Sequence, residues 1–420
     1  MTGGDKLRVL AEPAYRRLFL GRTTSLVGDG IAPVALAFAV LDLTGSATDL
    51  GIVLALHSAV LIALILVGGV VADRISPRLA MLGADVVRAV SMGLIAALLL
   101  AGEAQIWQLA LLYAVDGAAT AFFNPASNAI VPQIVPGGRL QEAIALLNFS
   151  RWGGKVGGPA VAGVLLAVAS PGVALAADAA TFVVSALCLW SVRAPGAPDR
   201  GEETFLGELR HGWREFSSRD WLVAIVISAA FTNAIFFPTF QVLGPTVAKE
   251  SLGGSSSWAL IATLWGVGGL AGGLAALSIR PRRPLLVSEG FILLLGLPAL
   301  LLAIPASTAV IAIGALIAGS TVSLAEILFD TASAQHVPQE ALSRVTAYDW
   351  FGSLALEPLT LALIGPLAAG IGISTTLWIG AGAITLCQLA VFLVPGVWRL
   401  ESIPAEPLPT PPPRPIEAGD

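Results

Sequence analysis

The sequence predicts an all-α membrane protein with 12 transmembrane helices in two six-helix pseudo-repeat halves. Hydrophobic residues make up 56% of the 420 residues and charged residues only 12%, and the mean hydropathy is +0.83. Soluble domains carry about 25% charged residues. A water-soluble fold could not bury this much apolar surface, so the bilayer must solvate most of the chain. Apolar stretches of spanning length recur, and two motifs of the first half return in the second.

A helix needs about 20 apolar residues to cross a bilayer. On this basis the first six spans are 18–42, 50–72, 79–101, 106–132, 141–168 and 171–192, and the last six are 221–246, 256–279, 285–304, 307–336, 346–369 and 373–395. We therefore divide the chain into an N-terminal half (1–192), a cytoplasmic linker (193–220), a C-terminal half (221–395) and a Pro-rich cytoplasmic tail (396–420) that we expect to be disordered.

The linker contains Leu206, Leu209, Trp213 and Phe216 at helical spacing. This pattern predicts an amphipathic helix on the membrane face that joins the halves. A flexible linker with one short helix fits nearly as well.

Lysines and arginines fix the expected orientation. With the N-terminus in the cytoplasm, all of them outside the spans fall on the inside except Lys249. The positive-inside rule then predicts that both termini are cytoplasmic. The first apolar stretch is long and lacks a small-residue cleavage site, so we interpret it as a retained helix. Arginine in excess of lysine and abundant alanine and glycine favour a bacterial source, and hence the inner (cytoplasmic) membrane.

The halves resemble each other in two places. FNPASNAIVPQ (123–133) aligns with FDTASAQHVPQ (329–339), and GGVVADRISPR (68–78) aligns with GGLAALSIRPR (272–282). Six spans in each half with the same orientation indicate a parallel repeat, which is typical of secondary transporters. The substrate path would lie between the halves.

These motifs resemble those of the major facilitator superfamily. Gly69, Asp73, Arg74 and Arg78 match its motif in the loop between helices 2 and 3, although Ser76 and Pro77 depart from it. The resemblance implies that Asp73 binds the N-terminus of helix 11, where Arg344 could pair with it, as a cytoplasmic gate. For the arginines alone, a purely topological role stays open.

GKVGGPAVAG (154–163) resembles the family's antiporter motif in helix 5. Gly154, Gly158, Pro159 and Gly163 match it. The resemblance implies an exporter that exchanges substrate for protons, because that motif occurs mainly in such antiporters. The stretches AFFNPASNAIVPQIVP and RLQEAIALLN further resemble the macrolide-efflux and enterobactin-exporter branch, of drug:proton antiporter type. Physically, the glycines let a neighbouring helix approach closely and the proline bends the helix, which predicts a seal or pivot.

Charged groups at bilayer depth are costly, about 2.5–3.5 kcal/mol on insertion scales, and indicate function. Asp29, Asp116 and Glu357 are the candidates for proton coupling, and Arg151 would modulate the pKa of the carrier, because a nearby cation favours the ionised carboxylate. A static Arg151–Asp116 ion pair is the alternative.

Other charges receive structural interpretations. We expect Asp85 and Arg88 to pair on a helix surface and His57 to be a satisfied polar residue, and Asp178 has no evident partner. GVGGLA at Gly266 matches a dinucleotide fingerprint only loosely and predicts helix packing.

Large rings and amides would line the substrate cavity and suit a bulky amphipathic molecule. For each ring, a lipid-facing position is the alternative. The candidates are Phe122, Asn148, Phe231, Asn233, Phe236, Phe237, Trp265 and Trp350.

The sequence thus predicts a proton-coupled exporter of drugs, macrolides or siderophore-like metabolites. A lipid or lysolipid carrier, an importer, and a non-transporting receptor or assembly protein are the alternatives. A net charge of -5 argues against nucleic acid as a partner, and no P-loop, hydrolase motif or metal-ligand spacing is present, so we expect no enzyme activity, cofactor or metal. The expected partners are a small-molecule substrate, protons and the lipid bilayer, and the expected state is a monomer.

Overall fold

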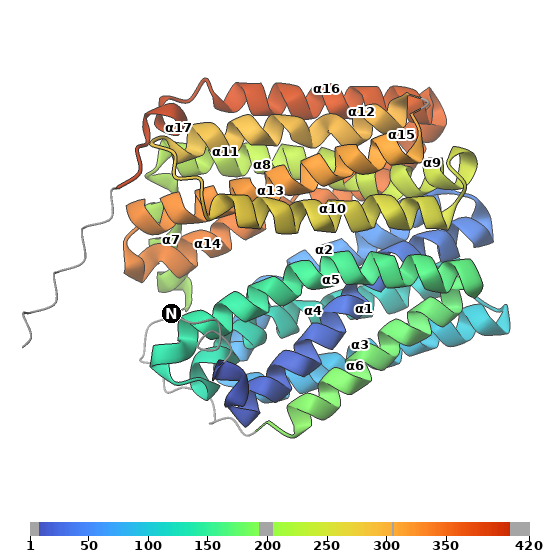
Figure 1. The fold of residues 1–420 in the computed structure, drawn as a ribbon, viewed down its shortest axis with the longest axis horizontal. Coiled ribbons are helices and arrows are strands. Elements are labelled where there is room, and N and C mark those ends of the chain that lie inside the picture. Colours follow the sequence, from blue (N-terminus) through green and yellow to red (C-terminus); the bar gives the residue numbers. More distant parts are fainter. Residues whose placement is uncertain (1–7, 193–204, 305, 404–420) are drawn as a thin grey trace, which may run out of the picture.

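The computed structural model describes residues 8–192, 205–304 and 306–403, and leaves out the side chains of 66–74, 205–209, 211, 339, 340 and 343. In these ranges the chain folds into two bundles of helices, one per half of the sequence (Figure 1). The first bundle contains α1 (Pro13–Thr44), α2 (Ala47–Arg74), α3 (Pro77–Ala101), α4 (Ile106–Ile134), α5 (Leu140–Val168) and α6 (Pro171–Trp190).

The second bundle repeats this plan with broken helices. Its members are α8 (Asp220–Pro238), α9 (Gly244–Ser251), α10 (Ser255–Ala276), α11 (Pro284–Ile292), α12 (Leu297–Ala303), α13 (Thr308–His336), α14 (Gln339–Leu354), α15 (Glu357–Ile371), α16 (Ile373–Val391) and the short α17 (Pro395–Arg399). A π-helical turn joins α8 to α9, and a 3-10 turn joins α11 to α12. Each pair therefore forms one interrupted span, as do α14 and α15.

Within the described residues, eleven helices or joined helices are long and apolar enough to cross a membrane. The twelfth predicted span corresponds to α5, which has 29 residues but carries Arg151, Lys155 and several glycines. The all-α membrane fold predicted from composition is confirmed.

The described part of the linker forms the helix α7 (Phe205–Ser217). Its rings pack against α14: the centroid of Trp213 lies 5.5 Å from that of Tyr348, and that of Phe216 lies 6.1 Å from it. The helix therefore lies on the second bundle.

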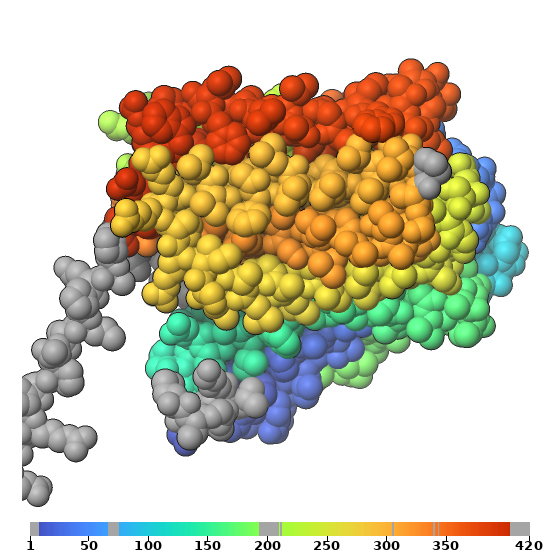
Figure 2. Space-filling model, turned by 45° about the horizontal axis from the view of Figure 1, so that its top comes forward, coloured from blue at the N-terminus to red at the C-terminus, as the bar shows by residue number. Residues whose placement is uncertain are grey.

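The bundles meet mainly through two helix pairs, α5 with α10 and α2 with α15. Figures 1 and 2 show the first of these seams, where yellow α10 lies along green α5. At the end away from the termini, Lys249 Nζ donates to Leu41 O and lies 2.6 Å from Asp42 Oδ1, and Gly365 of α15 lies against Thr48 of α2.

The distribution of the hydrophobic core shows that the two ends of the molecule differ. One large cluster joins both bundles at the end away from the termini, through residues such as Leu41, Leu50, Ala259 and Leu361. At the end that carries the termini, each bundle has its own separate cluster. The structure is therefore closed at one end, and the cores of the halves separate toward the other.

Candidate functional site

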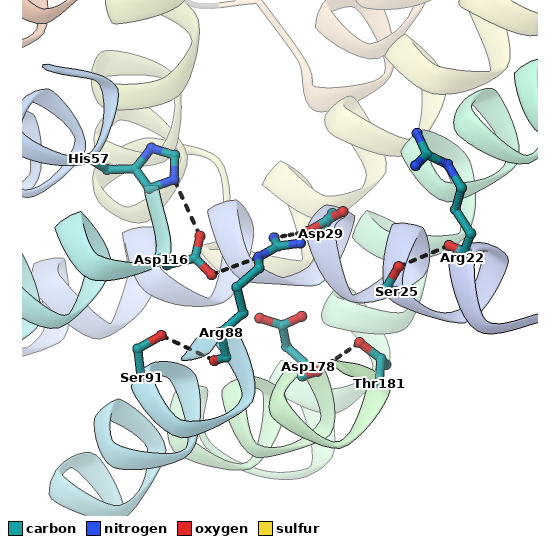
Figure 3. Close-up of polar contacts among 9 residues, drawn as sticks. All are labelled: Arg22, Ser25, Asp29, His57, Arg88, Ser91, Asp116, Asp178 and Thr181. Atoms are coloured by element: carbon teal, nitrogen blue, oxygen red, sulfur yellow. Dashed lines mark hydrogen bonds and ion pairs between the residues drawn. The ribbon is translucent and has the colours of Figure 1, made fainter. Parts of the chain in front are cut away.

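The centre of the first bundle holds a buried arginine. Arg88 of α3 is 5% exposed. Its Nε donates to Asp116 Oδ1 of α4 at 3.0 Å, its Nη2 pairs with Asp29 Oδ1 of α1, and its guanidinium carbon lies 3.9 Å from the ring centroid of Phe182 (Figure 3). Three helices thus converge on one cation.

His57 of α2 completes this group. Its Nε2 lies 3.3 Å from Asp116 Oδ2, and its ring stacks on Tyr113 with the centroids 4.1 Å apart. Gly117 makes this approach possible, because a Cβ there would lie 2.6 Å from the backbone oxygen of His57. We call Asp29, His57, Arg88 and Asp116 the Arg88 cluster.

The members of the Arg88 cluster differ in access. The side chain of Asp116 is 3% exposed, whereas that of Asp29 is 34% exposed. Gly30, the residue after Asp29, packs on Gly154, Gly158 and Pro159 of α5. Asp29 is thus the more exposed carboxylate of the Arg88 cluster.

Arg88 is where sequence reasoning was wrong. Asp85 and Arg88 were predicted to pair on a helix surface, but Asp85 is 0% exposed and Arg88 binds Asp29 and Asp116 from other helices. Arg151, for which a static ion pair with Asp116 was the alternative interpretation, instead donates to Asn128 Oδ1 at 3.3 Å. The i, i+3 spacing of Asp85 and Arg88 is typical of a pair on a helix surface, but the same spacing also fits two residues on the inward face of a helix. The spacing alone therefore did not reveal that Arg88 is buried.

A second charged group joins the halves. Arg151 and Lys155 of α5 interact electrostatically with Glu326 of α13 in the opposite bundle, and Lys155 Nζ lies 4.1 Å from the ring centroid of Trp152. Among the described residues, no ion pair within 4.0 Å joins these cations to Glu326. The arrangement is attraction across the seam without direct contact.

The glycines of α5 serve two interfaces. A Cβ at Gly154 or Gly158 would collide with the α1 backbone, and one at Gly163 would lie 2.6 Å from Cβ of Ala259 in α10. Close packing was the physical prediction from the motif, and it is confirmed. On the facing helix, Gly266 lies against the backbone of Lys155, so this stretch serves helix packing.

The predicted cytoplasmic gate is described only in part. The side chains of Gly69, Asp73 and Arg74 lie outside the described residues. Arg78 donates from Nε to Leu189 O at 3.0 Å and from Nη2 to the next carbonyl at 2.5 Å, so it binds the C-terminal end of α6. Arg344 of α14 lies beside α7. The Asp73–Arg344 latch stays a prediction.

Glu357 begins α15, directly after the break that follows α14. In the described part of the chain its carboxylate has no ion pair or hydrogen bond. Arg151, which occupies the equivalent position in the first half, interacts with Glu326 and not with Glu357.

The cavity candidates separate into two groups. Phe236, Phe237 and Trp265 pack together within the second bundle: Phe236 is only 2% exposed, meets Phe237 edge to face and stacks on Trp265 with the ring centroids 5.0 Å apart. This places Phe236 in the core of the bundle.

The other candidates are more accessible. Phe231 and Trp350 are 50% and 58% exposed. Asn148 is exposed, Phe122 is half-buried, and Asn233 Nδ2 donates to Ser353 O at 3.2 Å.

The two bundles, the parallel repeat and the charges at bilayer depth define a multi-pass membrane transporter. The chain belongs to the Major Facilitator Superfamily, whose family model matches residues 18–356.

Several relatives of this chain are named as drug efflux proteins. Macrolide efflux protein A of Streptococcus pyogenes is 23% identical over 244 residues, 57% of this chain and 60% of that protein. The match thus spans less than two thirds of that relative's length. The multidrug efflux pump Tap of Mycolicibacterium fortuitum is 27% identical over 387 residues, which cover 88% of this chain and 93% of that one.

Solved transporters share the fold at low identity. The nucleoside transporter NupG superposes with a TM-score of 0.72 at 14% identity, over 90% of this chain and 98% of that one. A bacterial homologue of the human lysosomal transporter Spinster, in an inward-facing and unoccupied conformation, gives 0.68 at 16% identity, over 95% and 97%.

Proposed function

We propose that this protein is a proton-coupled exporter of bulky amphipathic small molecules that works by alternating access between its two halves. The efflux relatives support the direction and the substrate class. The protein would reside as a monomer in the bacterial cytoplasmic membrane with both termini inside. The end that carries the termini is then cytoplasmic, and the described state, closed at the other end, faces inward.

One observation carries the proton coupling. Asp29 binds the buried cation Arg88 and is also the more exposed carboxylate of the Arg88 cluster. Protonation of Asp29 would remove one of the two aspartates that neutralise Arg88. Arg88 would then keep Asp116 as its ion-pair partner, and its Nη2, no longer held by the Asp29 carboxylate, would be free to rearrange. Proton binding at Asp29 is thereby linked to the packing of α1 against α3.

Helix α1 passes this change to the seam between the halves. Gly30, next to Asp29, lies against Gly154, Gly158 and Pro159 of α5, and α5 is the main contact of the first bundle with α10. A shift of α1 would therefore displace α5. Lys155 and Arg151 of α5 would change their distance to Glu326 at the same time. This chain of contacts is our proposal for how proton binding opens and closes the seam.

The test is accumulation of ethidium and of a macrolide in an efflux-deficient bacterial host, with and without a protonophore. We expect the protein to lower accumulation and the protonophore to restore it. Asp29→Asn, present in the membrane at normal levels, should no longer lower accumulation of the compounds. The exposed control Glu103→Gln should lower it as the wild type does. Proton-independent export, or unchanged export by Asp29→Asn, would contradict the coupling. No export of any compound would favour a lipid carrier, an importer or a receptor.

A further inference from the structure

A second carboxylate lies behind the Arg88 cluster. Asp178 of α6 is 0% exposed, and among the described residues neither of its carboxylate oxygens has a hydrogen-bond partner. In Figure 3 it points toward Arg88, with no bond drawn between them. The charged and titratable groups that face it are Asp29 from α1, Arg88 from α3, and Asp116 and Tyr113 from α4.

The place for this side chain is built into the neighbouring helices. Gly28 of α1 leaves room for it, because a Cβ there would collide with Asp178 Oδ1 and with Thr181 Oγ1. The Thr181 hydroxyl donates its hydrogen to the backbone oxygen of Asp178 at 2.7 Å. Its oxygen can therefore only accept a further hydrogen bond. A protonated carboxyl could donate to it, and a carboxylate could not.

Charge balance gives an independent argument. The interior of the first bundle contains four aspartates, two arginines and one histidine, which interact electrostatically with one another: Asp29, His57, Asp85, Arg88, Asp116, Asp178 and Arg22. All of them except Asp29 and His57 are buried. With every aspartate ionised and the histidine neutral, this group would carry two excess negative charges. Arg88 is already bound to Asp29 and Asp116. Excess charge without a partner is not sustained in such a low-dielectric interior.

We propose that Asp178 is a second proton site, which keeps a proton behind Arg88 and passes it to Asp29. In the described state Asp178 is a neutral acid while Arg88 binds the Asp29 and Asp116 carboxylates. In the transfer the O–H bond of Asp178 breaks and one forms on Asp29. Arg88 then turns from the neutral Asp29 to the new Asp178 carboxylate. The total charge of the group does not change.

This role deepens the proposed proton-coupled export and rests on it, but the proton store can be tested without transport. The probe is infrared spectroscopy of the purified full-length protein in lipid vesicles at neutral pH, read at the C=O stretching band of protonated carboxyls. We expect the wild type to show an acid band that Asp178→Asn reduces. Asp42→Asn, the same change at the carboxylate paired with Lys249, should leave the band intact. A wild type without an acid band would overturn the proposal, even if no variant folds.

The link to Arg88 has its own variant. Asp29→Asn takes one carboxylate from Arg88, so Asp178 should ionise to replace it, and the acid band should fall as it does in Asp178→Asn. The double variant should fall no further than either single one. If Asp29→Asn keeps the wild-type band, Asp178 does not exchange with Arg88 and the transfer is refuted. If the export assay fails but the acid band changes as expected in both variants, the proposed function alone is overturned.

Stability provides a second readout. If Asp178 is a neutral acid, the Asp178→Asn variant, which carries an isosteric amide, should unfold at a melting temperature close to that of the wild type. If it is instead an ionised partner of Arg88, Asp178→Asn should unfold at a clearly lower temperature, and that result would also overturn the proposal.

Discussion

Removal of the Arg88 side chain tests the central electrostatic argument. Arg88→Met keeps an unbranched chain of similar length over Phe182 but removes the guanidinium that binds Asp29 and Asp116. Removing one partner of a buried ion pair costs about 3–5 kcal/mol, because the remaining charge is left uncompensated. This corresponds to a loss of about 150- to 5,000-fold in the ratio of folded to unfolded protein.

The matched control is Arg139→Met in the same bundle. Arg139 Nη1 lies 3.0 Å from Glu12 Oε1, and these side chains are 38% and 36% exposed. An exposed pair contributes about 0–1 kcal/mol because water and salt screen it.

In thermal unfolding of the purified variants in detergent, the melting temperature should therefore fall much further for Arg88→Met than for Arg139→Met. A second mutation, Asp116→Asn, should recover part of the loss by removing an orphaned charge, and so reveal non-additivity. Equal melting temperatures for the two single variants, or additive losses in the double variant, would refute the view that Arg88 is a compensated buried cation.

Three further predictions concern other contacts. Gly158→Val should lower folded yield in the membrane, with an overpacking cost of about 1–3 kcal/mol or more, because its Cβ would meet the α1 backbone; Gly153→Val, in open space, should not, and equal yields would contradict the packing. Lys249→Gln removes an exposed contact at the closed end, and the loss of about 1 kcal/mol of stabilisation should let an impermeant maleimide label an Ala47→Cys variant up to about fivefold faster. An unchanged labelling rate would show that the contact does not stabilise this state. Gln335→Ala breaks two side-chain hydrogen bonds to the backbone of Ile403 and should speed proteolytic removal of the tail. An unchanged rate of proteolysis would show that these bonds do not hold the tail.

Sequence reasoning determined the architecture of this protein, because the constraint is local. A bilayer requires about 20 apolar residues for each crossing, so composition and span length predict the helices whatever their partners. The antiporter-type glycines could be interpreted for the same reason, since the absence of a side chain at Gly154 or Gly158 permits close packing with any neighbour.

Only the tertiary structure decided which charges meet. Asp29, His57, Arg88 and Asp116 come from four helices, and the sequence contains no spacing that brings Arg88, rather than Arg151, to Asp116. The choice depends on the rotation of each helix about its axis and on its neighbours, which side-chain packing sets across the whole bundle. For the same reason Phe236, a ring predicted to line a cavity, lies in the core of the second bundle.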